Sequence, residues 1–137
     1  MNPPIPGTVD SRGVLSISSP YAFADTVSRL LSAFATHGIK VFDVINQQAE
    51  ALAAGLAMPP TTLIVFGNPK AGTPLMLARP QSGIDLPLKL LVSESIPGEV
   101  SVSFNAADYI LERHFLPPEL KSNLVAAERL IETTLLP

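Results

Sequence analysis

The segment from Phe66 to Met76, FGNPKAGTPLM, groups residues whose types and spacing suit ligand binding. Glycine is favoured where backbone approaches a ligand closely, and a helix N-terminus offers N–H donors and partial positive charge to an anion. This segment could therefore hold a small anionic ligand, a carboxylate or a phosphate, near the start of a short helical turn capped by Thr73 ahead of Pro74. Its candidate ligand-binding residues are the two glycines, the lysine and two polar neighbours: Gly67, Asn68, Lys70, Gly72 and Thr73.

The same segment also suits a purely architectural role. Asn68 and Pro69 favour a turn, and a rigid loop after the apolar run 63–66 needs no ligand to explain it. The segment is not a phosphate-binding P-loop, because it lacks the Gly-Lys-Ser/Thr ending of that motif.

Lys89 is a further candidate, since a lysine in an apolar setting can act as a nucleophile or base. It lies between Leu88 and Leu90 in an expected strand. Alternation along that strand also allows the ordinary arrangement, in which these neighbours point inward and the lysine faces solvent.

His114 is the histidine of most chemical interest. It follows Ala107, Ile110 and Leu111 at helical spacing, which predicts a place on the apolar face of a helix. A ligand or proton-transfer role requires a nearby carboxylate or metal, whereas a packed and hydrogen-bonded histidine requires neither.

Several kinds of chemistry find no support in the sequence. The chain has no cysteine, which excludes disulfides, thiolate catalysis and thiolate metal sites. It has no Gly-x-Ser-x-Gly motif and no His-x-x-x-His pair, and the carboxylates of Asp108 and Glu112 have the spacing of a solvated helix face. We expect no metal and no cofactor, and a catalytic role is less favoured than a binding role.

The composition favours a single domain with an apolar surface for a partner. The 137 residues are 47% hydrophobic and only 15% charged, with a net charge of −3. The nine Lys and Arg residues are scattered, so nucleic-acid binding is not expected. The first residues do not resemble a signal peptide, and no apolar run approaches the roughly 18 residues of a membrane span, so we expect a soluble cytoplasmic protein without membrane contact.

Periodicity and capping residues predict the elements that must position these candidates. Residues 1–12 read as a loose tail, and residues 13–137 as one domain. Ser19-Pro20 should begin a helix whose apolar face includes Phe23 and Phe34 and which ends at Gly38, and Asn46 should cap a small helix closed by Gly55. Asn105 should cap a further helix, and a C-terminal helix follows Pro117-Pro118. The expected strands cover residues 14–18, 40–45, 62–66, 86–93 and 100–104.

The order of these elements predicts an α+β fold. The order is β-α-β-β-β-β-α with short inserted helices, and adjacent strands lack the crossover helix that a parallel sheet requires. We therefore expect a curved, mostly antiparallel sheet with helices packed on one face.

The sequence resembles the small prokaryotic family called domain of unknown function 302. The resemblance rests on the 66–76 segment, on Asp85-Leu86-Pro87-Leu88-Lys89 and on residues 105–109 and 113–114, and it covers residues 13–135. It implies a sheet of the TATA-binding-protein-like type and a homodimer, and it implies no established reaction. Family members often carry Asp-His where this chain has Asn46-Gln47.

Two classes of function follow from these observations. One is a non-catalytic homodimeric binding or interaction module, favoured by the low charge and the high apolar content. The other is a small-molecule binding protein or enzyme whose pocket is lined by the 66–76 segment, with Lys89 or His114 contributing. A pocket beneath these residues would favour the second class, and a filled core would favour the first.

Overall fold

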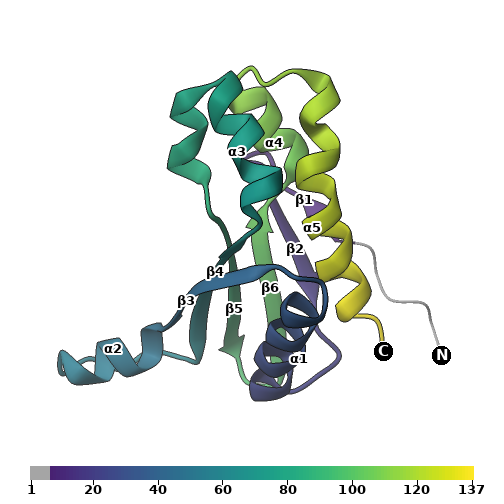
Figure 1. Ribbon diagram of the computed structural model, residues 1–137. Helices are drawn as coiled ribbons and strands as arrows, with labels where there is room; N and C mark the ends of the chain where they lie inside the picture. Colours follow the sequence, from purple (N-terminus) through teal and green to yellow (C-terminus); the bar gives the residue numbers. More distant parts are fainter. Residues whose placement is uncertain (1–6) are drawn as a thin grey trace.

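The computed structural model describes residues 7–137 as a sheet with helices around it (Figure 1). The strands are β1 (Thr8–Val9), β2 (Val14–Ser18), β3 (Lys40–Asn46), β4 (Thr61–Gly67), β5 (Leu88–Ile96) and β6 (Glu99–Asn105). The helices are α1 (Phe23–Thr36), α2 (Gln47–Ala53), α3 (Pro69–Ala78), α4 (Ala107–Arg113) and α5 (Lys121–Thr134), with short 3-10 segments η1 (Pro80–Asp85) and η2 (Pro118–Leu120).

The sheet is antiparallel throughout, which confirms the predicted α+β fold. Its six strands lie in the order β1-β2-β6-β5-β4-β3. The predicted hairpin between β5 and β6 forms around Gly98, whose φ of +85° is readily adopted by glycine. β3 is one edge of the sheet and the two-residue β1 is the other.

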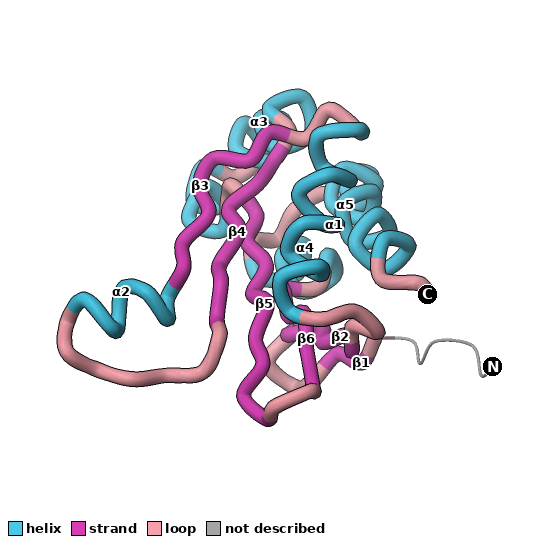
Figure 2. The backbone as a smooth tube through the Cα atoms, turned by 90° about the horizontal axis from the view of Figure 1, so that it is seen from below, coloured by secondary structure: helices cyan, strands magenta, loops and turns pink. Residues whose placement is uncertain are grey.

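Alternation along the strands creates the core on one face of the sheet. In β6, Val100, Val102 and Phe104 are buried while the serines between them are half-buried. Figure 2 shows α1 and α5 together on one side of the strands. The rings of Phe34 from α1 and Phe66 from β4 stack with centroids 4.4 Å apart, which joins this helical layer to the sheet.

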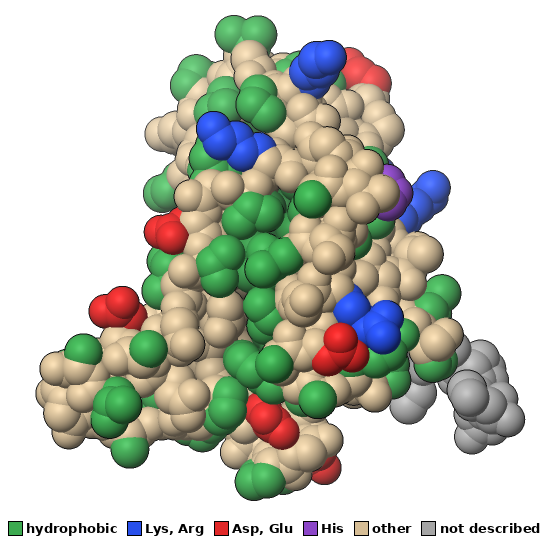
Figure 3. All heavy atoms as spheres, turned by 60° about the horizontal axis from the view of Figure 1, so that its bottom comes forward, with side chains coloured by type: hydrophobic (Ala, Val, Ile, Leu, Met, Phe, Trp, Pro, Cys, Tyr) green, Lys and Arg blue, Asp and Glu red, His purple; other side chains and the backbone are tan. Residues whose placement is uncertain are grey.

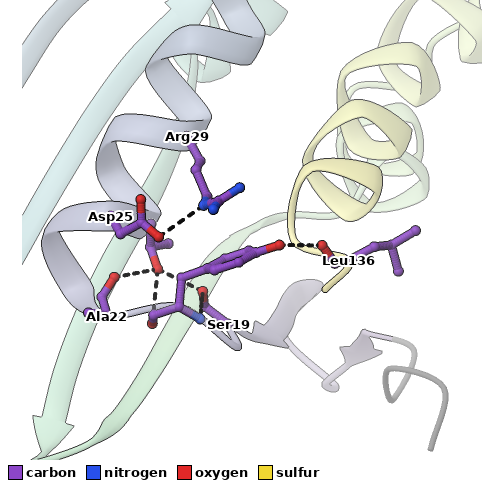
Figure 4. A network of polar contacts seen from close by, with 7 residues as sticks. Ser19, Ala22, Asp25, Arg29 and Leu136 are labelled. Atoms are coloured by element: carbon purple, nitrogen blue, oxygen red, sulfur yellow. Dashed lines mark hydrogen bonds and ion pairs between the residues drawn. The ribbon is translucent and has the colours of Figure 1, made fainter. Parts of the chain in front are cut away.

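The N-terminal end of α1 differs from the prediction. The helix begins at Phe23 after Ala22, and the Ser19 hydroxyl bonds to Thr26 Oγ1 at 2.7 Å and accepts from Tyr21 N at 3.2 Å instead of capping the helix (Figure 4). The Tyr21 hydroxyl donates to the carbonyl of Leu136 at 2.6 Å. A local turn therefore competes with capping and ties the start of α1 to the end of the chain.

Two other predicted helix starts are wrong, and the tail is shorter than expected. The helix in the 66–76 segment begins at Pro69 with Asn68 as its cap, because Asn-Pro supplies the same cap and first position as Thr-Pro does, five residues earlier in the chain. Asn105 ends β6, and α4 begins at Ala107. Residues 8–9 form β1 against β2, so part of the predicted tail belongs to the sheet, while residues 1–6 lie outside the described residues.

The small helix α2 extends away from the rest of the molecule (Figure 1). Asn46 caps it as predicted, with its side-chain oxygen accepting from Ala49 N at 2.9 Å, and Gly55 follows it with a φ of +81°. No residue of α2 is buried, and nearby Leu52 and Leu56 are 74% and 66% exposed. We call residues 46–60 the α2 arm.

Hydrophobic side chains also gather elsewhere on the surface. Figure 3 shows many of them along the middle of one face, with most charged side chains set away from them, and others on the projection that carries α2. Within residues 7–137, no helix is both long enough and apolar enough to cross a bilayer.

Candidate functional site

A cavity of about 520 Å³ lies beside the 66–76 segment. Its walls come from residues 37–39 just after α1, from β3, from the end of β4, from α3, from residues 86–88 and from one face of α5. α3 and α5 run alongside one another on the same side of the sheet (Figure 1). The volume is within the range of roughly 300 to 1,000 Å³ that is typical of small-molecule sites.

Small side chains on facing walls create the hollow. Gly67, Ala71 and Gly72 line it from one side, and Ala126 and Ala127 from α5 line it from the other. A Cβ atom built on Gly72 has Leu86 Cδ1, 3.9 Å away, as its nearest neighbour. The helices are held apart by the surrounding contacts, so the volume missing from these residues remains as open space.

The lining is apolar with a few neutral polar groups. Its polar side chains are His37, Asn68, Thr73 and Asn123, and no Lys, Arg, Asp or Glu is found among the described residues that line it. Asn123 Nδ2 donates to the carbonyl of Ala71 at 3.0 Å and so links α5 to α3 across the cavity wall.

The 66–76 segment lines this cavity, but its backbone donors do not converge on a common point. Lys70 N donates to Asn68 Oδ1 at 3.0 Å, and the N–H groups of Ala71 and Gly72 donate to the carbonyl of Asn68 at 2.9 Å. Pro69 has no N–H to offer. The first donors of α3 are therefore occupied within the helix, and the exposed Lys70 is not among the lining residues.

Lys89 lies outside this cavity. It is exposed on β5, directly opposite Val65 of β4, while its neighbour Leu90 is buried in the core. Its position matches the alternative in which strand alternation turns the lysine outward.

His114 is also separate from the cavity and has a carboxylate partner. Its Nε2 lies 2.5 Å from Oδ2 of Asp85, and the side chains of His114 and Asp85 are only 7% and 9% exposed. Arg113 Nη1 donates to both Asp85 oxygens at 3.0 Å. The buried Asp85 thus joins η1 to the end of α4, which holds the adjoining residues 86–88 in place as a cavity wall.

The sequence indicated some of this site and missed the rest. Four candidate residues line the cavity together: Gly67, Asn68, Gly72 and Thr73. Lys70, Lys89 and His114 do not join them. The lining residues His37, Phe42 and Asn123 were not predicted, and no spacing rule relates them to the 66–76 segment. Among residues 7–137, no group of three His, Asp or Glu side chains is arranged to hold a metal ion.

One carboxylate near this region has a shifted pKa. Burial raises the pKa of Glu128 on α5 above its ordinary value, and the N–H of Ala107, which donates to Glu128 Oε1 at 3.3 Å, opposes this shift. The Glu128 carboxylate therefore accepts a hydrogen bond at the start of α4, but its partial burial disfavours the charged form.

Similar solved structures support the fold. A crystal structure of an uncharacterized conserved protein DUF302 from Bacillus stearothermophilus matches with a TM-score of 0.76 and 18% identity, covering 90% of this chain and 95% of that one. At this identity the similarity shows the shared fold alone.

Curated relatives carry a region similar to this chain within longer proteins. Proteins named fluoride-specific ion channel FluC 1 from Brucella suis biovar 1 (strain 1330) and Brucella abortus biovar 1 (strain 9-941) are each 37% identical over 114 residues, which is 83% of this chain. The match covers 44% and 42% of those proteins, so the chain spans less than half their length. Their names describe those whole proteins.

A family model matches most of the chain. It is described as "Domain of unknown function DUF302" and aligns with residues 15–134, which includes every strand from β2 to β6 and the lining of the cavity. The chain therefore belongs to the DUF302 family.

Proposed function

We propose that this protein binds a small molecule with an apolar body in the cavity between α3, α5 and β3. The observation that carries the proposal is a cavity of about 520 Å³ with an apolar lining and a few neutral polar groups. Apolar walls that gather in one hollow open to water mark binding sites on soluble proteins, which favours a use for this one.

A binding role is supported over a catalytic one by the position of the reactive side chains. Lys89 and His114 lie away from the cavity, and the His114 side chain is buried against Asp85. The polar groups that do line the cavity suit recognition of a ligand, and no nucleophile paired with a base is found among the described lining residues.

The test uses a neutral fluorescent probe, Nile red, and two substitutions at one position. Gly72→Leu places a branched side chain into the cavity from α3. Gly72→Ala is the matched control, because its Cβ has ordinary van der Waals distance to Leu86 and leaves most of the space open.

We expect the native protein and Gly72→Ala to bind Nile red with similar affinity, and Gly72→Leu to lose at least about tenfold in affinity. Circular dichroism melting of all three proteins checks that each is folded. Equal binding by native protein and Gly72→Leu, with both folded, would place the probe elsewhere and contradict the proposal.

We also propose that the protein forms a homodimer through the α2 arm. A seven-residue helix without buried side chains gains little from packing in one chain, yet it carries Leu52 and presents Leu56 just beyond its end. Docking against a second copy would remove these leucines from water. The low charge of the chain favours such self-association.

A further inference from the structure

We infer that the ligand of this cavity is an uncharged molecule with an apolar body and one hydroxyl-type head, which both donates and accepts a hydrogen bond. This inference rests on the proposed binding function and adds the chemical class of the ligand. It follows from three features of the lining. The described lining carries no charged side chain, the first backbone N–H groups of α3 already donate to Asn68, and the polar side chains still have hydrogen-bond donors and acceptors to offer.

Charge is disfavoured because nothing in the described lining would neutralise it. Among residues 7–137, no Lys, Arg, Asp or Glu lines the cavity, and a charge removed from water without a partner carries a large desolvation cost. The N-terminus of α3, which in other proteins attracts anions, has its first N–H groups bonded to the side chain and carbonyl of Asn68. A carboxylate or phosphate would find neither a cation nor these donors.

His37 supplies a hydrogen-bond acceptor. Its Nδ1 lies 2.9 Å from the carbonyl oxygen of Ala33, and a carbonyl only accepts, so the proton of the neutral ring is on Nδ1. The remaining ring nitrogen, Nε2, is then an acceptor on a residue that lines the cavity. A ligand group that faces it must donate.

Asn68 and Thr73 supply donors. Asn68 uses its Oδ1 to accept from Lys70 N, which leaves its amide NH₂ for another partner, and the Thr73 hydroxyl can donate or accept. A hydroxyl head can pair with either kind of group, because it both donates and accepts. A carboxylate only accepts and an ammonium only donates, so each can pair with only one of the two kinds of group.

The body of the ligand must be apolar. The remaining walls are mainly aromatic and aliphatic, and they include Phe66, Leu75, Leu86, Leu88, Leu124 and Leu130. Burial of hydrocarbon against these side chains supplies the affinity, while the polar groups select the head.

The test is displacement of Nile red by three compounds with the same chain and different heads: decanol, decanoate and decylammonium. Each is used at neutral pH and below the concentration at which it forms micelles. We expect decanol to displace the probe at least about tenfold more effectively than either ion. His37→Phe keeps a flat ring but removes the acceptor, so it should reduce the advantage of decanol over the two ions. His37→Gln retains an acceptor, so it should reduce that advantage less.

The outcomes separate this inference from the proposed function. If Nile red binds to native protein and not to Gly72→Leu, the cavity binds ligands whatever the head-group result. Stronger displacement by decanoate or decylammonium than by decanol would overturn the inference of an uncharged ligand. Equal displacement by all three, with no effect of His37→Phe, would also overturn it by showing that the head is not recognised.

Discussion

Asp85 is the residue that links the site to the fold. A buried carboxylate is costly unless it is paired, and here Arg113 and His114 from the end of α4 satisfy it. Its neighbours Leu86 and Pro87 line the cavity, so this cluster acts on the ligand site by positioning one wall. Its chemistry is thus structural, although an Asp-His pair also occurs in catalytic sites.

Glu128 gives a prediction about pH at the residue scale. Because burial raises the pKa of its carboxyl in the folded protein, the folded state holds the proton more tightly than the unfolded state does. The resulting stabilisation is present below the unfolded carboxyl pKa of about 4.3 and is lost as the pH rises through the folded value. Glu128→Gln should therefore be more stable than native protein at neutral pH and equal to it in acid.

Urea unfolding midpoints at neutral and acidic pH measure this difference. Glu112→Gln, on an exposed position of α4, is the control and should show little of the effect, because Glu112 is not among the charges that act on the Glu128 carboxyl. A native protein that is more stable than Glu128→Gln at neutral pH would show that the bond from Ala107 N outweighs the cost of burial.

At the scale of elements, the α2 arm is the part with least support from the rest of the chain. No residue of α2 is buried, so its order within one chain depends on local bonds such as the Asn46 cap. Short helices that lack tertiary packing are only marginally stable. Local opening should therefore be easier here than in α1 or α5.

Asn46→Ala tests this reasoning. Removal of a helix cap costs about 1 kcal/mol, and in α2 that cost should appear as local opening. We expect faster amide hydrogen exchange over residues 47–54, unchanged exchange in α1, and an unchanged urea midpoint for global unfolding. Faster exchange throughout the sheet would mean that the arm is coupled to the core.

In the whole molecule, the cavity and the α2 arm are separate features. We assign ligand binding to the cavity and dimer formation to the α2 arm. The cavity lies between α3, α5 and the ends of β3 and β4, whereas the α2 arm extends from the far end of the edge strand β3 (Figure 1). Phe42 of β3 lines the cavity and is 45% exposed, so the two regions approach one another along that strand.

The homodimer proposal is tested by substitutions in the arm. Leu52→Ser combined with Leu56→Ser should shift the protein from two chains to one in sedimentation equilibrium at micromolar concentration, because both leucines lose their apolar surface. Leu77→Ser on α3 is the control, since Leu77 is 80% exposed and lies outside the arm. Native protein that sediments as a single chain would refute the proposal.

Much of the architecture could be predicted from local patterns. The alternation in β6, the helical spacing of Phe23 to Phe34, and the turn glycines each depend on residues that are close in sequence, and the structure confirms them. Helix starts are harder to predict, because the Ser19 hydroxyl bonds within a competing local turn and Asn105 pairs with Val14 in the sheet.

The sequence by itself determined the α+β class, the antiparallel hairpins and the segment that lines the site, because propensity, periodicity and capping act over a few residues. Only the tertiary structure decided that the site is a cavity, that Lys70 and Lys89 lie outside it, and that His114 pairs with Asp85, 29 positions away. The physical reason is distance. A cavity is volume left unfilled between Gly72 on one helix and Ala127 on another, and the hydrogen bond between Asp85 and His114 requires two distant groups to meet, so neither exists until the chain has folded.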